Sequence, residues 1–142
     1  MADDLIPIEL VDDTGSVQPA TVFVSETPTG ELCVTLRWAG GELSASAQDA
    51  FTAFCMVRVR LVDFRLLPRC FGACRNLVLS SMAYQMGRGL KGYLVRLGEP
   101  ARLADLVRIF DKRPDMDLAT VAEQKEFKQR WLRSLGTRPA GS

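Results

Sequence analysis

Hydrophobic and polar residues alternate through much of the first fifty positions, a pattern typical of β-strands with one buried face. Residues 5–11 (LIPIELV) and 20–25 (ATVFVS) are rich in β-branched or aliphatic side chains, and turn-forming residues follow at 12–15 and 27–30. Residues 31–38 (ELCVTLRW) alternate most regularly, and a short piece at 42–44 extends the pattern. We therefore predict an antiparallel β-meander in this part of the chain.

Helical spacing replaces the alternation after this meander. The region 46–62 places phenylalanines three residues apart behind Ser46, which predicts a helix with Ser46 as its N-cap. A strand is the alternative there, because Val57, Val59 and Leu61 alternate with arginines. Pro100 predicts the start of another helix over 101–111. The apolar residues of that helix recur at i, i+3, i+4 and i+7 and are expected to be buried: Leu103, Leu106, Val107 and Phe110.

Shorter patterns predict the remaining elements. Residues 66–73 indicate an edge strand broken by a proline, residues 81–87 a brief helix capped by Ser80 or Ser81, and residues 90–97 a further strand. Residues 112–117 are predicted to be a linker. Thr120 and Glu123 have the spacing of a capping box, and an i+4 stripe of Phe127, Trp131 and Leu135 predicts a final helix that stops at Gly136.

The predicted fold class is α+β: an N-terminal antiparallel β-meander that continues into a mixed or antiparallel sheet, with helices packed mainly on one face. A chain of 142 residues fits a single globular domain, 1–142, with enough buried surface for a core of its own. The ordered core is expected over about 5–135. Residues 1–4 and the flexible tail 136–142 are expected to fray.

The chain contains no histidine, which excludes Ser-His-Asp and Cys-His catalysis and every histidine-ligated metal site. Four cysteines occur without a visible secretory signal, and no apolar run is long enough to span a membrane. We therefore expect a cytoplasmic protein with four reduced thiols. The spacing Cys70-x-x-x-Cys74 is poor for zinc, but Arg69 and Arg75 leave a reactive thiol open as an alternative.

The segment Gly87-Arg-Gly-Leu-Lys-Gly92 matches the glycine pattern of dinucleotide-binding loops. In those loops a strand comes before the glycines and a helix after them, whereas here the predicted order is reversed. Turn formation and close packing explain the glycines instead. We predict no cofactor and no metal.

Charge is divided unevenly along the chain, although the net charge is only +1. Residues 1–50 hold nine acidic side chains and one arginine, whereas 58–96 hold eight basic side chains and one aspartate. We expect partial neutralisation between the halves, with a basic excess on one face around Arg69, Arg75, Arg88 and Lys91 that attracts an anionic group. Known nucleic-acid-binding modules have sequence signatures that this stretch lacks. A protein partner is therefore favoured over nucleic acid.

An irregular segment, 69–91, gathers the candidate binding residues. They are Arg69, Cys70, Cys74, Arg75, Asn76, Arg88 and Lys91. Loops of this kind on a rigid scaffold often carry binding groups. Since no coherent catalytic set exists, the first hypothesis is a small non-enzymatic accessory, adaptor or inhibitor protein of bacterial type, acting through a protein–protein surface. The alternatives are a small-ligand-binding protein or enzyme with a site at 69–91, and an anion or nucleic-acid binder using 58–96.

Overall fold

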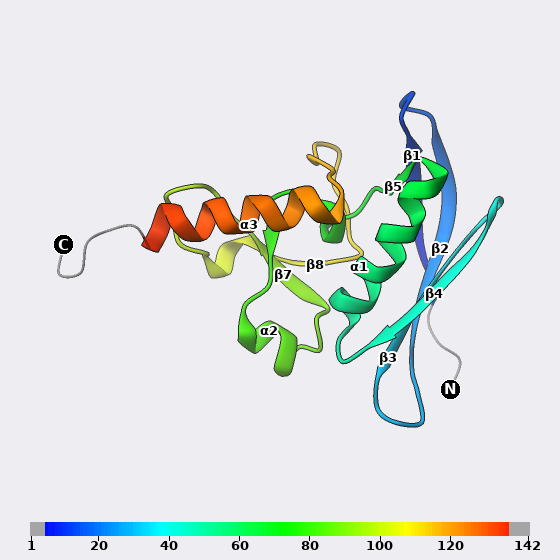
Figure 1. The fold of residues 1–142 in the computed structure, drawn as a ribbon, viewed down its shortest axis with the longest axis horizontal. Helices are drawn as coiled ribbons and strands as arrows, with labels where there is room; N and C mark the ends of the chain where they lie inside the picture. Colours follow the sequence, from blue (N-terminus) through cyan, green and yellow to red (C-terminus); the bar gives the residue numbers. More distant parts are fainter. Residues whose placement is uncertain (1–4, 137–142) are drawn as a thin grey trace.

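The computed structural model describes residues 5–136, and the larger of its two sheets is a curled, five-stranded antiparallel sheet. The strands are β1 (Ile6–Asp12), β2 (Val17–Glu26), β3 (Leu32–Trp38), β4 (Gly41–Ala47) and β5 (Leu66–Pro68). Their order across the sheet is β4-β3-β2-β1-β5, so the first four strands form the predicted meander. Figure 1 shows this sheet at one end of the molecule, with α1 (Ala50–Leu61) against it.

Turn chemistry explains where the first strands end. Asp12 Oδ1 accepts hydrogen bonds from the backbone N–H groups of Thr14 and Ser16 at 2.9 Å each, which closes the β1–β2 turn. Gly30 has φ of 89° in the β2–β3 turn, a left-handed conformation that glycine adopts without strain. The inward residues of β3 are Leu32, Val34, Leu36 and Trp38, and all four are buried, as the alternation predicts.

The main core lies between this sheet and α1, which contacts β3 and β4. Phe54, Val57 and Leu61 project from α1 and are completely buried. The predicted helix is confirmed, but the predicted N-cap is wrong. Ser46 lies in β4 opposite Cys33, and Asp49 caps the helix by accepting a hydrogen bond from Thr52 N at 2.8 Å.

A second, three-stranded antiparallel sheet has the order β6-β7-β8. Its strands are β6 (Leu77–Val78), β7 (Lys91–Leu94) and β8 (Leu106–Arg108). The short helix α2 (Ser81–Gln85) lies between β6 and β7 in the sequence, and its N-cap is Ser80, as predicted. One cluster of buried side chains includes residues of both sheets, so the described residues form a single compact α+β unit. The predicted continuous sheet is therefore two sheets around one core.

The predicted helix over 101–111 is wrong. This region forms a 3-10 turn, Leu103–Asp105, followed by β8, in which Leu106 and Val107 pair with Tyr93 and Gly92 of β7. Leu103 is 79% exposed, whereas Phe110 is buried as predicted. Pairing with β7 satisfies backbone groups that a helix would otherwise satisfy internally, so tertiary structure overrides the local spacing.

The predicted edge strand over 66–73 is only partly correct. Strand β5 pairs with β1 at the edge of the large sheet but ends at Pro68. A 3-10 turn, Phe71–Ala73, follows it, because the backbone N–H groups of Phe71 and Gly72 bond to the carbonyl oxygens of Asp111 and Ile109 rather than to a neighbouring strand of that sheet. Strand 90–97 is likewise shorter than predicted, since β7 covers Lys91–Leu94.

The final helix, α3 (Val121–Gly136), follows its prediction closely. Thr120 N–H donates to the Glu123 carboxylate at 2.8 Å, and Glu123 N–H donates to Thr120 Oγ1 at 3.2 Å, which completes the capping box. The backbone hydrogen bond from Thr120 lowers the pKa of Glu123. Trp131 is buried on the predicted stripe, and its indole N–H donates to Glu99 O. The predictions for residues 1–4 and 137–142 lie outside the described residues.

Ion pairs connect the acidic first part of the chain with the basic remainder. Glu9 pairs with Arg69 and Lys112, and Glu26 pairs with Arg88. These contacts bring together residues that are 60, 103 and 62 positions apart in the sequence, so the two charge-biased regions partly neutralise each other. None of the helices within residues 5–136 combines the length and apolar character needed to cross a lipid bilayer.

Candidate binding cleft

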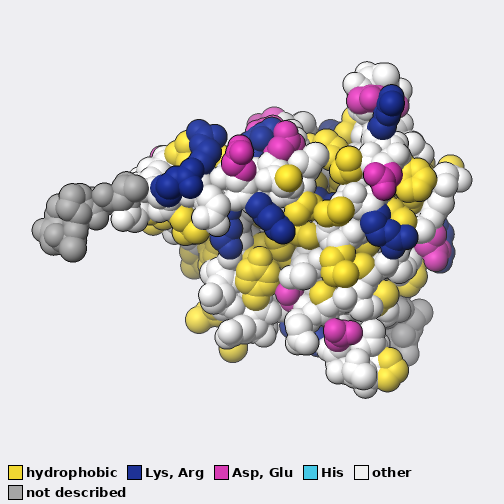
Figure 2. All heavy atoms as spheres, viewed as in Figure 1, with side chains coloured by type: hydrophobic (Ala, Val, Ile, Leu, Met, Phe, Trp, Pro, Cys, Tyr) yellow, Lys and Arg dark blue, Asp and Glu magenta, His cyan; other side chains and the backbone are white. Residues whose placement is uncertain are grey.

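A cleft of about 300 Å³ opens between α1, α2, β6 and α3. Its lining is apolar at the floor and polar along the α3 side. The lining residues are Phe51, Cys55, Leu77, Val78, Leu79, Tyr84, Val121, Gln124, Lys125, Lys128 and Gln129. Figure 2, which has the same orientation as Figure 1, shows hydrophobic side chains gathered between α2 and α3 and across α1. Basic side chains lie above them along α3. This concave apolar surface with a basic border is a candidate binding site.

Helix α1 supplies one wall of the cleft. Asp49 fixes the start of α1, and the first and second turns then present Phe51 and Cys55 to the cleft. Gly89 lies so close to this N-terminus that a Cβ atom on it would meet the Asp49 carboxylate and Phe51 N, and its φ is 76°. Ala50 N–H also donates to Arg88 O at 2.8 Å. The α2–β7 loop therefore packs against the helix start and holds the wall in place.

Those contacts also explain the glycine motif at 87–92. Gly89 provides the left-handed turn and the close approach to α1. Gly92, in β7, lies beneath Leu77 and Leu79, where a Cβ atom would collide with a leucine methyl group. Packing accounts for both glycines, in agreement with the interpretation made from the sequence.

Helix α3 supplies the opposite wall. Val121, Gln124, Lys125 and Lys128 follow i, i+3, i+4 and i+7 spacing, which places them along one side of the helix. The predicted apolar stripe of α3 faces elsewhere, because Phe127, Trp131 and Leu135 pack with Val78 and Val95. The helix thus uses one side for the core and a neighbouring side for the cleft.

Tyr84 of α2 closes the cleft between the two walls. Its ring meets Phe51 edge-on, with ring centroids 6.3 Å apart. Burial, helped by the nearby Cys55 and Asp49, raises the pKa of the Tyr84 hydroxyl to about 12. The hydroxyl therefore stays protonated at neutral pH, where it can act as a hydrogen-bond donor but not as a base.

Arg58 lies beneath the cleft and is only 2% exposed. Its guanidinium donates to Gln124 Oε1 at 2.7 Å, to Gly72 O at 2.9 Å and to Ala119 O at 3.0 Å. It also donates to Cys55 Sγ at 3.7 Å. Two of these partners, Gln124 and Cys55, line the cleft. Arg58 therefore connects α1 with the 3-10 turn and with the start of α3.

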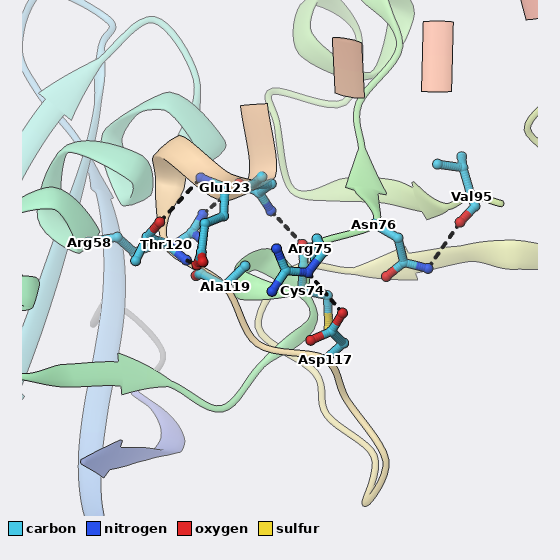
Figure 3. A network of polar contacts seen from close by, with 10 residues as sticks. Arg58, Cys74, Arg75, Asn76, Val95, Asp117, Ala119, Thr120 and Glu123 are labelled. Carbon is cyan, nitrogen blue, oxygen red and sulfur yellow. Dashed lines mark hydrogen bonds and ion pairs between the residues drawn. The ribbon is translucent and has the colours of Figure 1, made fainter. Parts of the chain in front are cut away.

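Gln124 extends the same network, part of which Figure 3 shows. Its amide Nε2 donates to Gly72 O at 2.9 Å and to Cys74 O at 2.8 Å. Backbone bonds run alongside, from Ala119 N to Ala73 O and from Arg75 N to Asp117 O. The segments 72–75 and 117–119 thus lie side by side, and they anchor the N-terminal end of α3.

Burial makes three of the cysteines poor nucleophiles. It raises the pKa of Cys70 to about 12, raises that of Cys74 to about 11, and raises that of Cys55 as well. The nearby Arg58 opposes these shifts without cancelling them. All four cysteines are free thiols, and Cys70 and Cys74 are buried.

These pKa values predict slow reaction of the native protein with a thiol reagent such as DTNB at pH 7–8. A thiol whose pKa is raised carries little thiolate until the pH approaches that value, so Cys70 and Cys74 should stay unmodified while the protein is folded. The same reagent in denaturant, without reductant, should count four thiols. Rapid reaction of all four in the native state would contradict the burial, and fewer than four in denaturant would indicate a disulfide.

The structure distributes the seven predicted binding residues among several contacts. Arg69 pairs with Glu9, Arg75 with Asp117, and Arg88 with Glu26, so these three arginines meet acids from three different segments. Arg88 also donates to Gly30 O at 2.6 Å. Because these guanidinium groups already have acidic partners, less of their charge is available to phosphate groups of a nucleic acid.

The other four predicted residues also lie apart from the cleft. Cys70 and Cys74 are inside the core, Asn76 donates to Val95 O at 3.1 Å, and Lys91 lines a groove with Arg108 and Asp111. None of the seven lines the cleft. Their role as a binding set stays a prediction.

Sequence reasoning missed the residues that do line the cleft. The sequence of α3 does contain a signal for its cleft side. Beside the apolar stripe, the polar residues Gln124, Lys125 and Lys128 follow helical spacing. Arg58 lies on the helical row that Phe51, Phe54 and Cys55 form in the sequence. Arg60, which is exposed, falls outside that row. The hydrogen-bond partners of Arg58 depend on the packing of α1 against the 3-10 turn and the start of α3, which the sequence does not show.

Comparison with protein-family models and with curated protein sequences finds no match to this chain. Within residues 5–136, no three Cys, Asp or Glu side chains come together in a way that could hold a metal ion.

Proposed function

We propose that this protein is a non-enzymatic binding protein that acts through contact with a protein partner, and that the cleft receives an apolar side chain of that partner. The observation that carries the proposal is the apolar lining formed by Phe51, Leu79 and Tyr84 beside a polar border. A volume of about 300 Å³ is at the small end for ligand sites, which favours one or two side chains over a large cofactor.

The exposed side of α1 supports a protein partner over a small molecule. Val59 is one helical turn beyond Cys55, and Val62 is three residues further, so the row leads from the cleft along the helix. Val59 is 58% exposed, and Met56, beside it, is 46% exposed. A partner that fills the cleft could also cover this row, which would extend the contact beyond the volume of a small ligand.

The chemistry of the cleft supports binding over catalysis. Its two weak acids, Cys55 and Tyr84, both have raised pKa values, so neither is activated at neutral pH. A cysteine or tyrosine that acts as a nucleophile or base at neutral pH needs a lowered pKa instead. A cytoplasmic location, in which all four thiols stay reduced, belongs to the same proposal.

Photo-crosslinking in the native host tests this proposal. We expect a benzoylphenylalanine residue at Gln129, on the border of the cleft, to give a discrete adduct with one protein. The same photoreactive residue at Val17, which is exposed at the start of β2, is the control and should not give that adduct. Identical adducts from both positions, or none from Gln129, would refute the cleft as the contact site. A small-molecule function would leave Gln129 without a protein adduct.

A further inference from the structure

Three cationic groups surround the cleft without acidic partners. Lys125 and Lys128 line it, and neither forms an ion pair within residues 5–136. Arg58, beneath it, bonds to carbonyl, amide and sulfur acceptors, and no carboxylate of the described chain pairs with it. Its Nε is the one buried side-chain nitrogen or oxygen in this part of the chain that lacks any hydrogen-bond partner.

Within residues 5–136 no acidic side chain lines the cleft, but one acidic group lies close to it. Asp49 lies at the start of α1 and is close enough to raise the pKa of both Cys55 and Tyr84. Its carboxylate is already engaged, since it accepts bonds from Thr52 N at 2.8 Å and Thr52 Oγ1 at 2.7 Å. The net charge at the cleft is therefore positive, and its solvent-accessible positive charge lies on the two lysines.

From this balance we infer that the partner presents an anionic apolar anchor: an aliphatic or aromatic side chain with a carboxylate beside it on the same protein segment. The apolar part would contact Phe51, Leu79 and Tyr84, and the carboxylate would lie near Lys125 and Lys128. This inference rests on the proposed function, because it specifies the chemistry of the partner at the same cleft.

Electrostatic complementarity is the physical reason for the preference. An apolar group alone would cover the cleft and displace water that solvates the lysines and the region above Arg58. It would provide no anionic group to interact with these cations in place of that water. An adjoining carboxylate supplies that partner where water is displaced, and the interaction strengthens as the local dielectric falls. A basic anchor would meet like charges and be rejected.

Two fluorescent probes with the same aromatic skeleton test the preference. Anilinonaphthalene sulfonate is an apolar anion, and N-phenylnaphthylamine is its uncharged counterpart. We expect the wild-type protein to bind the anion saturably and on the order of tenfold more tightly than the neutral probe. The double variant Lys125→Glu/Lys128→Glu should remove most of this difference and leave the affinity for the neutral probe unchanged.

The matched control is Arg130→Glu/Arg133→Glu, which makes the same change in net charge on exposed positions of α3 that do not line the cleft. It should retain the preference for the anion, and circular dichroism should show both double variants folded. Equal affinity for the two probes, or equal losses in the two double variants, would overturn the inference. The crosslink at Gln129 would be unaffected by that result, so failure of the anionic preference and failure of the proposed function are distinguishable.

Discussion

Replacing Phe54 with alanine is expected to lower the free energy of unfolding by about 3–5 kcal/mol. The Phe54 side chain is completely buried, and its ring meets Phe110 edge-on with the centroids 5.0 Å apart. It also covers Gly72, where even a Cβ atom would be only 2.9 Å from the ring. The substitution would leave a cavity between α1 and the 3-10 turn that the surrounding chain cannot fill. Urea titration, followed by circular dichroism, measures the loss.

Phe64→Ala is the matched control for this prediction. The Phe64 ring also meets another aromatic ring edge-on, that of Trp38, but Phe64 is 50% exposed. Its removal should therefore cost no more than about 1 kcal/mol. Similar losses in the two variants would show that the core does not depend on Phe54 as the structure indicates.

Arg58→Met should lower the free energy of unfolding by about 2–4 kcal/mol. Methionine removes the cost of burying a charge, but it leaves the Ala119 carbonyl and Gln124 Oε1 without their donors. Gly72 O keeps a donor, Gln124 Nε2, so the loss is smaller than the number of Arg58 contacts suggests. The same denaturant titration measures it.

Arg60→Met provides the comparison on the same helix. Arg60 is exposed, and its single bond, to Ser44 O, is long at 3.4 Å. We expect this variant to remain within about 0.5 kcal/mol of the wild type. A loss below about 1 kcal/mol for Arg58→Met would mean that the cost of burying its charge nearly equals the benefit of its hydrogen bonds.

The meander could be predicted because its determinants are local. Alternation along β3 and the turns at 12–15 and 27–30 specify strands that pair with their neighbours in the chain. The capping box and apolar stripe of α3 are local in the same way. Each signal lies within the element that it describes, so no knowledge of distant residues was needed.

The region 101–111 could not be predicted from the same kind of signal. Its apolar spacing fits a helix, but Leu106 and Val107 pair with β7, and Ile109 and Phe110 enter the core. The outcome depends on the position of a strand more than ten residues away. Local spacing contains no information about that strand, so it favours the wrong element.

The cleft was inaccessible to sequence reasoning for a related reason. Its residues come from 51–55, 77–84 and 121–129, and each group resembles an ordinary core or surface pattern by itself. The sequence predicts binding residues in the irregular segment 69–91 because this segment holds cysteines, glycines and arginines. In the structure much of that segment packs against α1 and α3, and its Leu77, Val78, Leu79 and Tyr84 contribute apolar surface to the cleft.

The strand order β4-β3-β2-β1 also has a consequence for folding kinetics. Neighbouring strands in this meander close short loops, whereas Arg58 meets Ala119 and Gln124 across 61 and 66 residues. Short loops cost less entropy to close and form sooner, so the meander can assemble with α1 before α3 docks. During synthesis the N-terminal sheet is available first, and the cleft has no second wall until α3 leaves the ribosome. A partner that requires both walls would therefore recognise the protein only after folding is complete.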